Sequence, residues 1–152
     1  MRRLLLKAAF GLLATAGPAL LCAADLPGDW PAFARDFVQA DGRVIDHEAE
    51  SISTSEGQAY ALFFALVAGD RARFETVLRW AEDNLAQGRL EDRAMAWKWG
   101  RDDQGQWRVL DANAASDADL WMAYTLYEAA RRWKVPAWRL KADAMQAHVA
   151  RD

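Results

Sequence analysis

Carboxylate residues stand at the starts of the two most apolar segments of the chain. Glu56 comes shortly before ten consecutive apolar or aromatic residues, 59–68. Asp117 and Asp119 open a second, mainly apolar segment, 117–133. A carboxyl group at the start of a helix is either a charge favoured by the helix dipole or a group that transfers protons in a reaction. The residue types alone leave both interpretations open.

The two apolar segments are predicted to be helices, and a helix that is apolar on all sides is normally surrounded by other helices. Thr54 or Ser55 is expected to cap the first helix with a side-chain oxygen, and Ser116 the second. Gly69 and Asp70 are expected to end the first. Asp117 and Asp119 are two residues apart, roughly 200° around a helix axis, so one faces a cleft while the other makes structural hydrogen bonds.

An amphipathic helix is predicted after each apolar one. The first has an apolar stripe that starts at Phe74, and Gly88 is expected to close it. Pro136 is expected to start the second, and a shorter leading helix is predicted from Trp30 to the Asp41-Gly42 turn. Alternating inner and outer helices are typical of hairpins stacked into a ring or solenoid. Inner helices in such a stack run parallel, so their N-termini share one rim.

The residues between the two helix pairs, 89–115, have the pattern of a small β-hairpin inside a long loop. Trp97-Lys98-Trp99 alternates as a strand does, residues 102–105 indicate a turn, and residues 107–110 indicate a second strand. Two short strands do not make a domain, so the fold class remains all-α.

No metal site or cofactor is expected. A calcium loop that began at Asp111 would need Gly at its sixth place and a carboxylate at its twelfth, where the chain has Ser116 and Met122. The chain has only two His residues, His47 and His148, and they are expected to be structural. A zinc site would need clustered His or Cys.

Residues 1–24 have the pattern of a secretory signal peptide. A basic start and a short apolar run lead to Cys22-Ala23-Ala24, and cleavage is expected before Asp25. Bulky Leu21 before Cys22 argues against a lipoprotein. Cleavage removes three basic residues and the only Cys, which leaves 16 basic and 22 acidic residues, a net charge of −6. The mature chain is expected in the periplasm or medium, without affinity for nucleic acid or the membrane surface.

The segment from Ala115 to Trp133, Ala-Ser-Asp-Ala-Asp-Leu-Trp-Met-Ala-Tyr-Thr-Leu-Tyr-Glu-Ala-Ala-Arg-Arg-Trp, resembles the signature of glycoside hydrolase family 8. Thr54-Ser55-Glu56-Gly57-Gln58 resembles the acid-bearing segment of the same family. With residues 41–46 and the loop 97–113, the chain is most similar to the periplasmic endoglucanases of bacterial cellulose-synthesis systems. The resemblance covers residues 30–140.

This resemblance implies an (α/α)6 barrel and the inverting hydrolysis of β-1,4-glucan. It implies Glu56 as the proton donor and Asp117 as the base or as the holder of a distorted sugar ring. Some members take the base from a later Asp. The family has six helical hairpins, whereas this chain supplies two and a leading helix. Residues 25–152 are therefore expected to be the N-terminal part of a truncated catalytic domain, inactive when alone.

Four more residues are expected at the substrate: Trp97, Trp99, Asn113 and Trp121. Each Trp has two interpretations, packing in the core or stacking under a sugar ring, and the second is strongest for the loop residues Trp97 and Trp99. Asn113 either hydrogen-bonds a sugar hydroxyl or caps the loop.

Other functions remain open at this stage. The expected partners are a β-1,4-glucan chain and the cellulose synthase export machinery. The first alternative keeps the family and changes the polymer to xylan, chitosan or mixed-linkage glucan. The second is a non-catalytic α-helical repeat that binds peptides or glycans, although no repeat of residue identities is visible in the chain.

Overall fold

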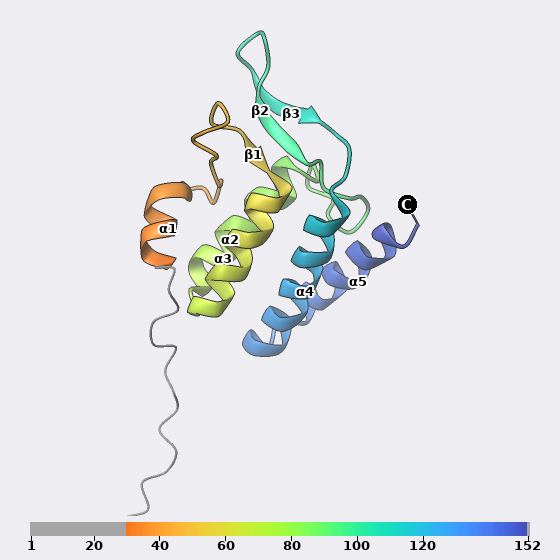
Figure 1. The fold of residues 1–152 in the computed structure, drawn as a ribbon. Helices are drawn as coiled ribbons and strands as arrows, with labels where there is room; N and C mark the ends of the chain where they lie inside the picture. Colours follow the sequence, from red (N-terminus) through yellow and green to blue (C-terminus); the bar gives the residue numbers. More distant parts are fainter. Residues whose placement is uncertain (1–29, 152) are drawn as a thin grey trace, which may run out of the picture.

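The computed structural model describes residues 30–151, and the predicted signal peptide, 1–24, lies outside them. The described chain is mainly helical with one small antiparallel sheet, as predicted (Figure 1). None of its helices is long and apolar enough to cross a membrane. In chain order the elements are α1 (Trp30–Phe37), β1 (Ser53–Thr54), α2 (Ser55–Ala68), α3 (Arg71–Asn84), β2 (Lys98–Arg101), β3 (Trp107–Asp111), α4 (Ser116–Trp133) and α5 (Pro136–Val149).

The predicted alternation of inner and outer helices is confirmed. The inner helices α2 and α4 pack against each other, α3 packs on α2, and α5 packs on α4. Figure 1 shows α2 and α4 side by side, with their N-termini at the end that carries the sheet. The two helix starts therefore share one rim, as the stacked-hairpin pattern requires.

The core lies between these four helices. Leu62 of α2, Met122 and Leu126 of α4, and Phe74 of α3 are fully buried. The Phe74 ring lies 4.9 Å and 5.0 Å from the rings of Trp133 and Trp138. These contacts join the first helix pair to the second across α3, α4 and α5.

Helix boundaries follow the sequence signals only in part. Thr54 caps α2, because its Oγ1 accepts a hydrogen bond of 3.1 Å from the Gly57 N–H, and Gly69 ends that helix. The prediction for Ser116 is wrong: it is the first residue of α4, and Ala115 at the cap position makes no side-chain bond.

Two predicted helix ends are also wrong. Helix α3 ends at Asn84, not at Gly88, because the hydrogen bonds beyond it are wider than the α-helical i→i−4 bond: the Ala86 N–H bonds the Ala81 carbonyl at 3.2 Å, and the Gly88 N–H bonds the Glu82 carbonyl at 2.8 Å. Helix α1 ends at Phe37, before the Asp41-Gly42 turn, because the next residues form an antiparallel bridge from Val38 to Val44.

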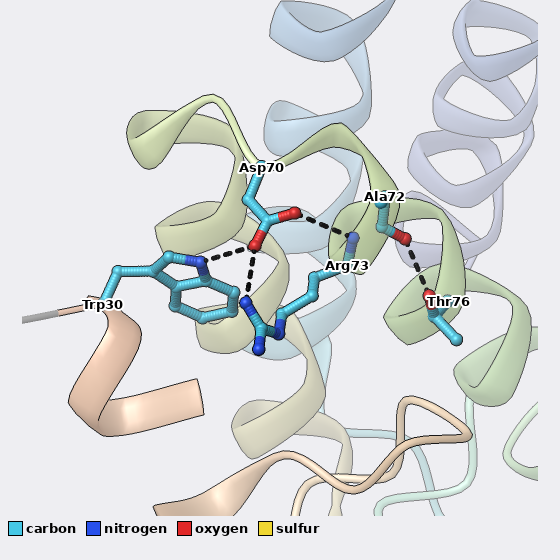
Figure 2. A network of polar contacts seen from close by, with 5 residues as sticks. All are labelled: Trp30, Asp70, Ala72, Arg73 and Thr76. Carbon is cyan, nitrogen blue, oxygen red and sulfur yellow. Dashed lines mark hydrogen bonds and ion pairs between the residues drawn. The ribbon is translucent and has the colours of Figure 1, made fainter. Parts of the chain in front are cut away.

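Asp70 fixes the corner between α2 and α3 and ties α1 to it (Figure 2). Its carboxylate accepts a bond of 3.0 Å from the Trp30 indole N–H and one of 3.0 Å from the Arg73 guanidinium. It also caps α3 by accepting the Arg73 N–H at 3.1 Å. Partial burial acts to raise the pKa of Asp70, but these donors outweigh it and hold the pKa below its ordinary value.

Gln58 is a fully buried polar residue that joins three segments. Its Oε1 accepts the Val44 N–H at 2.6 Å, and its Nε2 donates to the carbonyls of Gly42 and Val77 at 3.2 Å each. A buried amide is tolerated only when its groups are paired in this way. Gln58 therefore fixes the loop before β1 against α2 and α3.

The predicted hairpin is confirmed as β2 and β3, which pair antiparallel from Arg101↔Trp107 to Lys98↔Asp111 with an irregularity between Lys98 and Trp99. The sheet has a third strand that the sequence did not predict. In this strand, β1, Ser53 pairs with Trp99. The hairpin is thereby attached directly to the residues that begin α2.

Candidate active site

Glu56 lies in the first turn of α2 on the rim that faces the sheet. Its side chain is half-buried, and its Oε2 accepts a hydrogen bond of 3.1 Å from the Ser55 hydroxyl. Ser55 itself is fully buried. Sequence reasoning considered Ser55 only as a cap and missed this contact, for which adjacency to Glu56 is the only signal.

Asp117 and Asp119 separate as the helix geometry predicts. Asp117 is exposed in the first turn of α4. Asp119 is only 2% exposed, and its Oδ1 accepts the Met95 N–H at 3.4 Å. The prediction that one carboxylate makes structural hydrogen bonds is therefore confirmed for Asp119, and Asp117 is left with its side chain in the open.

The main chain of Trp97 connects the start of α2 to the segment before α4. The Trp97 carbonyl accepts the Ser55 N–H at 3.0 Å, and the Trp97 N–H donates to the Asn113 carbonyl at 2.8 Å. Glu56 follows Ser55 directly, and Asp117 comes four residues after Asn113. The backbone of Trp97 thus links the start of α2, which carries Glu56, to the segment that leads into α4, which carries Asp117.

The loop beside this connection is ordered by Asp111. Its Oδ1 accepts the backbone N–H of Asn113 at 2.9 Å. That bond and, after it, a hydrogen bond from the Trp97 side chain hold the pKa of Asp111 below its ordinary value. The Trp97 ring is half-buried, and the Asn113 side chain is exposed. Both predicted substrate residues are therefore positioned next to the rim.

Trp121 belongs to an exposed aromatic surface on α2 and α4, which we call the inner aromatic face. The Trp121 ring lies 5.0 Å from that of Phe63 and 6.2 Å from that of Tyr60. Large parts of this face are open, with Tyr60 46% and Tyr124 50% exposed. Its members are Tyr60, Phe63, Phe64, Trp121 and Tyr124.

Trp99 lies apart from the other predicted substrate residues. Its ring packs edge-on against the buried Trp80 of α3 at 5.1 Å and stacks on Trp107 at 5.0 Å. The structure thus brings Trp99 to the α3 side of the sheet. Its role in glucan binding stays a prediction.

Next to Glu56, a cavity of about 270 Å³ opens between α1, α2 and the loop before β1. Thr54, Gly57 and Tyr60 of the α2 start line one side of it, and Phe33 and Phe37 of α1 line the other. Within residues 30–151, no group of three or more His, Cys, Asp or Glu side chains is arranged to hold a metal ion.

Comparison with known proteins gives a consistent result. The endoglucanase of Escherichia coli (strain K12) is 47% identical over 124 residues, which are 81% of this chain and 34% of that protein. The endoglucanase of Xanthomonas axonopodis pv. citri is 48% identical over 145 residues, 93% of this chain and 38% of that protein. The chain thus spans about a third of the length of the curated relatives it matches.

Solved structures share the arrangement of helices and sheet described above. The endo-1,4-D-glucanase from Vibrio fischeri has a TM-score of 0.79 and 41% identity, over 84% of this chain and 37% of that one. The endo-β-1,4-glucanase from Acetobacter xylinum has a TM-score of 0.67 and 34% identity, over 76% and 35%. Residues 3–152 match the sequence profile of Glycosyl hydrolases family 8, and the resemblance seen in the sequence is confirmed. The chain belongs to family 8 of the glycosyl hydrolases and forms part of its (α/α)6 fold.

Proposed function

We propose that this protein is an endo-β-1,4-glucanase in which Glu56 is the general acid. The observation that carries the proposal is the Trp97 connection, which holds the helix starts of Glu56 and Asp117 on one rim. The similarity to proteins named endoglucanase supports the choice of β-1,4-glucan as the substrate. Because those relatives are about three times longer, the activity is proposed for the whole protein.

The proposed reaction needs a protonated acid and a carboxylate on opposite sides of the scissile bond. The Glu56 carboxyl group gives its proton to the leaving glycosidic oxygen as the bond to the anomeric carbon breaks. A water molecule attacks that carbon from the other face and loses a proton to a carboxylate, which inverts the configuration. Inverting enzymes hold the two carboxyl groups about 6.5–9.5 Å apart, with room for the water between them.

Ser55 and Asp117 also have defined parts in this scheme. The Ser55 hydroxyl, which bonds Glu56 at 3.1 Å, stabilises the carboxylate that remains after proton transfer. Asp117, exposed on the same rim, acts either as the base or as the residue that holds the distorted sugar ring.

The substrate is proposed to lie along aromatic side chains beside the rim. Trp97 is half-buried in the loop, and Trp121 is 37% exposed on α4. Their rings offer stacking faces for the apolar sides of glucose units. Asn113, exposed next to Trp97, is in a position to hydrogen-bond a sugar hydroxyl.

We further propose that the protein is exported, acts in the periplasm or medium, and serves bacterial cellulose synthesis beside the export machinery. The signal-peptide pattern of residues 1–24 and the resemblance to endoglucanases of cellulose-synthesis systems support this role. A co-purification experiment with cellulose synthase subunits tests the partner, and the absence of any association contradicts it.

The test of the catalytic proposal is Glu56→Gln in the full-length protein. This change keeps the size of the side chain and removes only the transferable proton. Loss of general acid catalysis is expected to lower the rate of reducing-sugar release from carboxymethylcellulose by about 10²–10⁴-fold. Glu48→Gln, at an exposed loop position, is the matched control and is expected to keep the wild-type rate.

A folded Glu56→Gln protein that cuts at the wild-type rate contradicts the proposal and leaves Glu56 as a helix-start charge. The same assay with xylan, chitosan and mixed-linkage glucan decides the polymer. If one of these polymers is hydrolysed faster than carboxymethylcellulose, that polymer is the substrate, and the proposed reaction stays the same.

A further inference from the structure

Trp107 is exposed, yet its ring is held in a fixed position. It is 43% exposed and stacks on Trp99 with 5.0 Å between ring centroids and an interplanar angle of 10°. The guanidinium carbon of Arg43 lies 4.3 Å from the Trp107 centroid and 4.6 Å from that of Trp99. Arg43 is buried and donates to the Ser53 hydroxyl at 2.8 Å. The indole is therefore a rigid aromatic platform at the surface.

A groove of about 560 Å³, which we call the outer groove, adjoins this platform. Trp99, the ring on which Trp107 stacks, forms part of its lining. Polar side chains line it as well, among them Asp41, Arg79, Asp83 and Asn84. Within residues 30–151, Arg79 and Asp83 have no hydrogen bond or ion pair through their side chains, so their polar ends remain available.

The outer groove is separate from the rim that carries Glu56 and Asp117. Its lining comes from α3, from β2 and from the turn at Ala40 and Asp41, and none of it comes from α2 or α4. A ligand in this groove lies against the outer helix of the first pair. It would not reach the proposed catalytic carboxylates from there.

The chemistry of the groove fits a neutral polysaccharide. A flat indole face packs against the C–H face of a pyranose ring, and carboxylate, amide and guanidinium groups hydrogen-bond the ring's hydroxyls. Asp41, Asp83 and Arg79 line the groove, and the guanidinium groups of Arg43 and Arg101 lie 4.3 Å and 5.2 Å from the centroid of the Trp107 ring. The net charge of −3 on the whole chain disfavours nucleic acids and other anionic polymers.

We propose that Trp107 and the outer groove form a second glucan-binding site, which holds a β-1,4-glucan chain without cutting it. The choice of the β-1,4-linked polymer rests on the proposed function. Such a chain is an extended ribbon. One flat face of it can stack on the Trp107 indole while the next sugar units lie in the polar groove beside it. The site would keep the protein on its polymer while the rim acts on another stretch of chain.

The test measures retention by glucan in full-length protein that carries Glu56→Gln, so that the polymer stays intact. Affinity electrophoresis in hydroxyethylcellulose gives the apparent dissociation constant, and pullulan serves as the α-linked comparison. In this background Trp107→Ala is expected to weaken retention by about five- to tenfold. The double change Arg79→Ala, Asp83→Ala is expected to weaken it as well, since it removes polar contacts from an exposed helix face.

Matched controls are available elsewhere on the surface. Arg89→Ala with Asp92→Ala changes the same two residue types at exposed positions outside the groove, and Leu140→Ala removes an exposed apolar side chain from α5. Both controls are expected to keep the parent retention. Equal retention of all variants overturns the proposal. Loss confined to Trp107→Ala, with a lowered unfolding temperature, also overturns it, because the stack then only anchors the hairpin.

This site and the proposed reaction can fail separately. With Glu56 intact, hydrolysis of cellopentaose reports the reaction alone. An inactive protein that loses retention through both groove variants contradicts only the catalytic proposal. If the protein is active and neither groove variant changes its retention, only the proposal of the outer site is contradicted.

Discussion

Among the glycines that the structure describes, Gly42 has the least room for a side chain. Its φ is +94°, and a Cβ atom added there would lie 2.2 Å from the carbonyl oxygen of Thr76 in α3. The Gly42 carbonyl also accepts the Gln58 amide, so the turn cannot move away without breaking a buried hydrogen bond. The loop that precedes β1 therefore packs backbone to backbone against α3 at Gly42 and Thr76.

We expect Gly42→Ala to lower the free energy of unfolding by more than about 3 kcal/mol, because both backbone strain and a steric clash oppose it. Gly105→Ala is the control. Its φ is +76°, but nothing lies within 4 Å of the added Cβ, so only the strain of about 1–2 kcal/mol remains. Urea denaturation measures both changes, and equal losses would contradict the clash.

At the residue scale, the sequence predicted positions better than contacts. The spacing of Asp117 and Asp119 predicted their divergence, because helix geometry alone decides it. For the Ser55–Glu56 bond the only signal was that the two residues are neighbours in the sequence. For the buried Gln58 there was no signal, because its partners Val44 and Val77 are brought in by the tertiary fold. Trp99 was predicted to contact the substrate together with Trp97. The irregularity in the strand pairing at Lys98 and Trp99 and the edge contact with Trp80 bring its ring to the α3 side instead.

At the element scale, Asp70 holds three helices at one corner (Figure 2). Its pKa is held below the ordinary Asp value of about 3.9. A depressed carboxyl pKa contributes stability that is present above the unfolded-state pKa and is lost as the pH falls through the folded-state pKa. The corner is therefore expected to weaken in acid.

Asp70→Asn keeps the shape and removes the charge, so we expect a loss of about 1 kcal/mol at neutral pH, the difference between charged and neutral hydrogen bonds. The gap between the two proteins should be constant from about pH 5 to pH 8 and should narrow as the pH falls below about 4, towards the lowered pKa of Asp70 in the folded protein. Asp103→Asn, at an exposed turn, is the control. A gap that stays the same size at all pH values would contradict the electrostatic account.

Strong periodicity made the long helices predictable, and turn residues between two strand patterns predicted the β2–β3 hairpin, but the shortest strand was not predicted. Helices α2 to α5 are each at least 14 residues long, and their apolar pattern is sustained over that length. Their existence was therefore predicted correctly. Strand β1 has two residues, too few for a pattern, and it exists only because Ser53 pairs with Trp99. The prediction of Ser116 as the cap was wrong because a helix can begin without a side-chain hydrogen bond at its cap position, as α4 does at Ala115.

At the scale of the whole molecule, the inner aromatic face is an apolar surface that no other element of the described chain covers. Phe64 and Trp121 are 41% and 37% exposed, beside the still more open Tyr60 and Tyr124. Burial of one large apolar side chain is worth about 1.5–3 kcal/mol. Several open ones weigh heavily against a domain stability of about 5–15 kcal/mol.

We therefore expect residues 25–152, expressed alone, to unfold without a sharp transition and to release no reducing sugar from cellulose. Calorimetry and a reducing-sugar assay check the two expectations. Binding of a hydrophobic dye is expected to be high and to fall when Tyr60, Phe64 and Tyr124 are changed to Gln. A cooperative transition together with endoglucanase activity would make this segment a complete enzyme.

Export is a second prediction at this scale. N-terminal sequencing of protein recovered from the periplasm is expected to begin near Asp25, after the small residues Ala23 and Ala24. Arg2→Glu with Arg3→Glu should leave more uncleaved precursor in the cytoplasm, since the basic start is lost. An intact Met1 on periplasmic protein would contradict the prediction.

The stacked pair of Trp99 and Trp107 has an optical consequence. Two indoles 5.0 Å apart and nearly parallel exchange excitation, so their circular dichroism differs from that of isolated tryptophans. Trp107 belongs to β3 and Trp99 to β2, and this coupling exists only while the hairpin is closed. The sheet therefore carries its own spectroscopic reporter, distinct from the helical signal, and a stopped-flow trace of the coupled band would time its closure against the assembly of the helices.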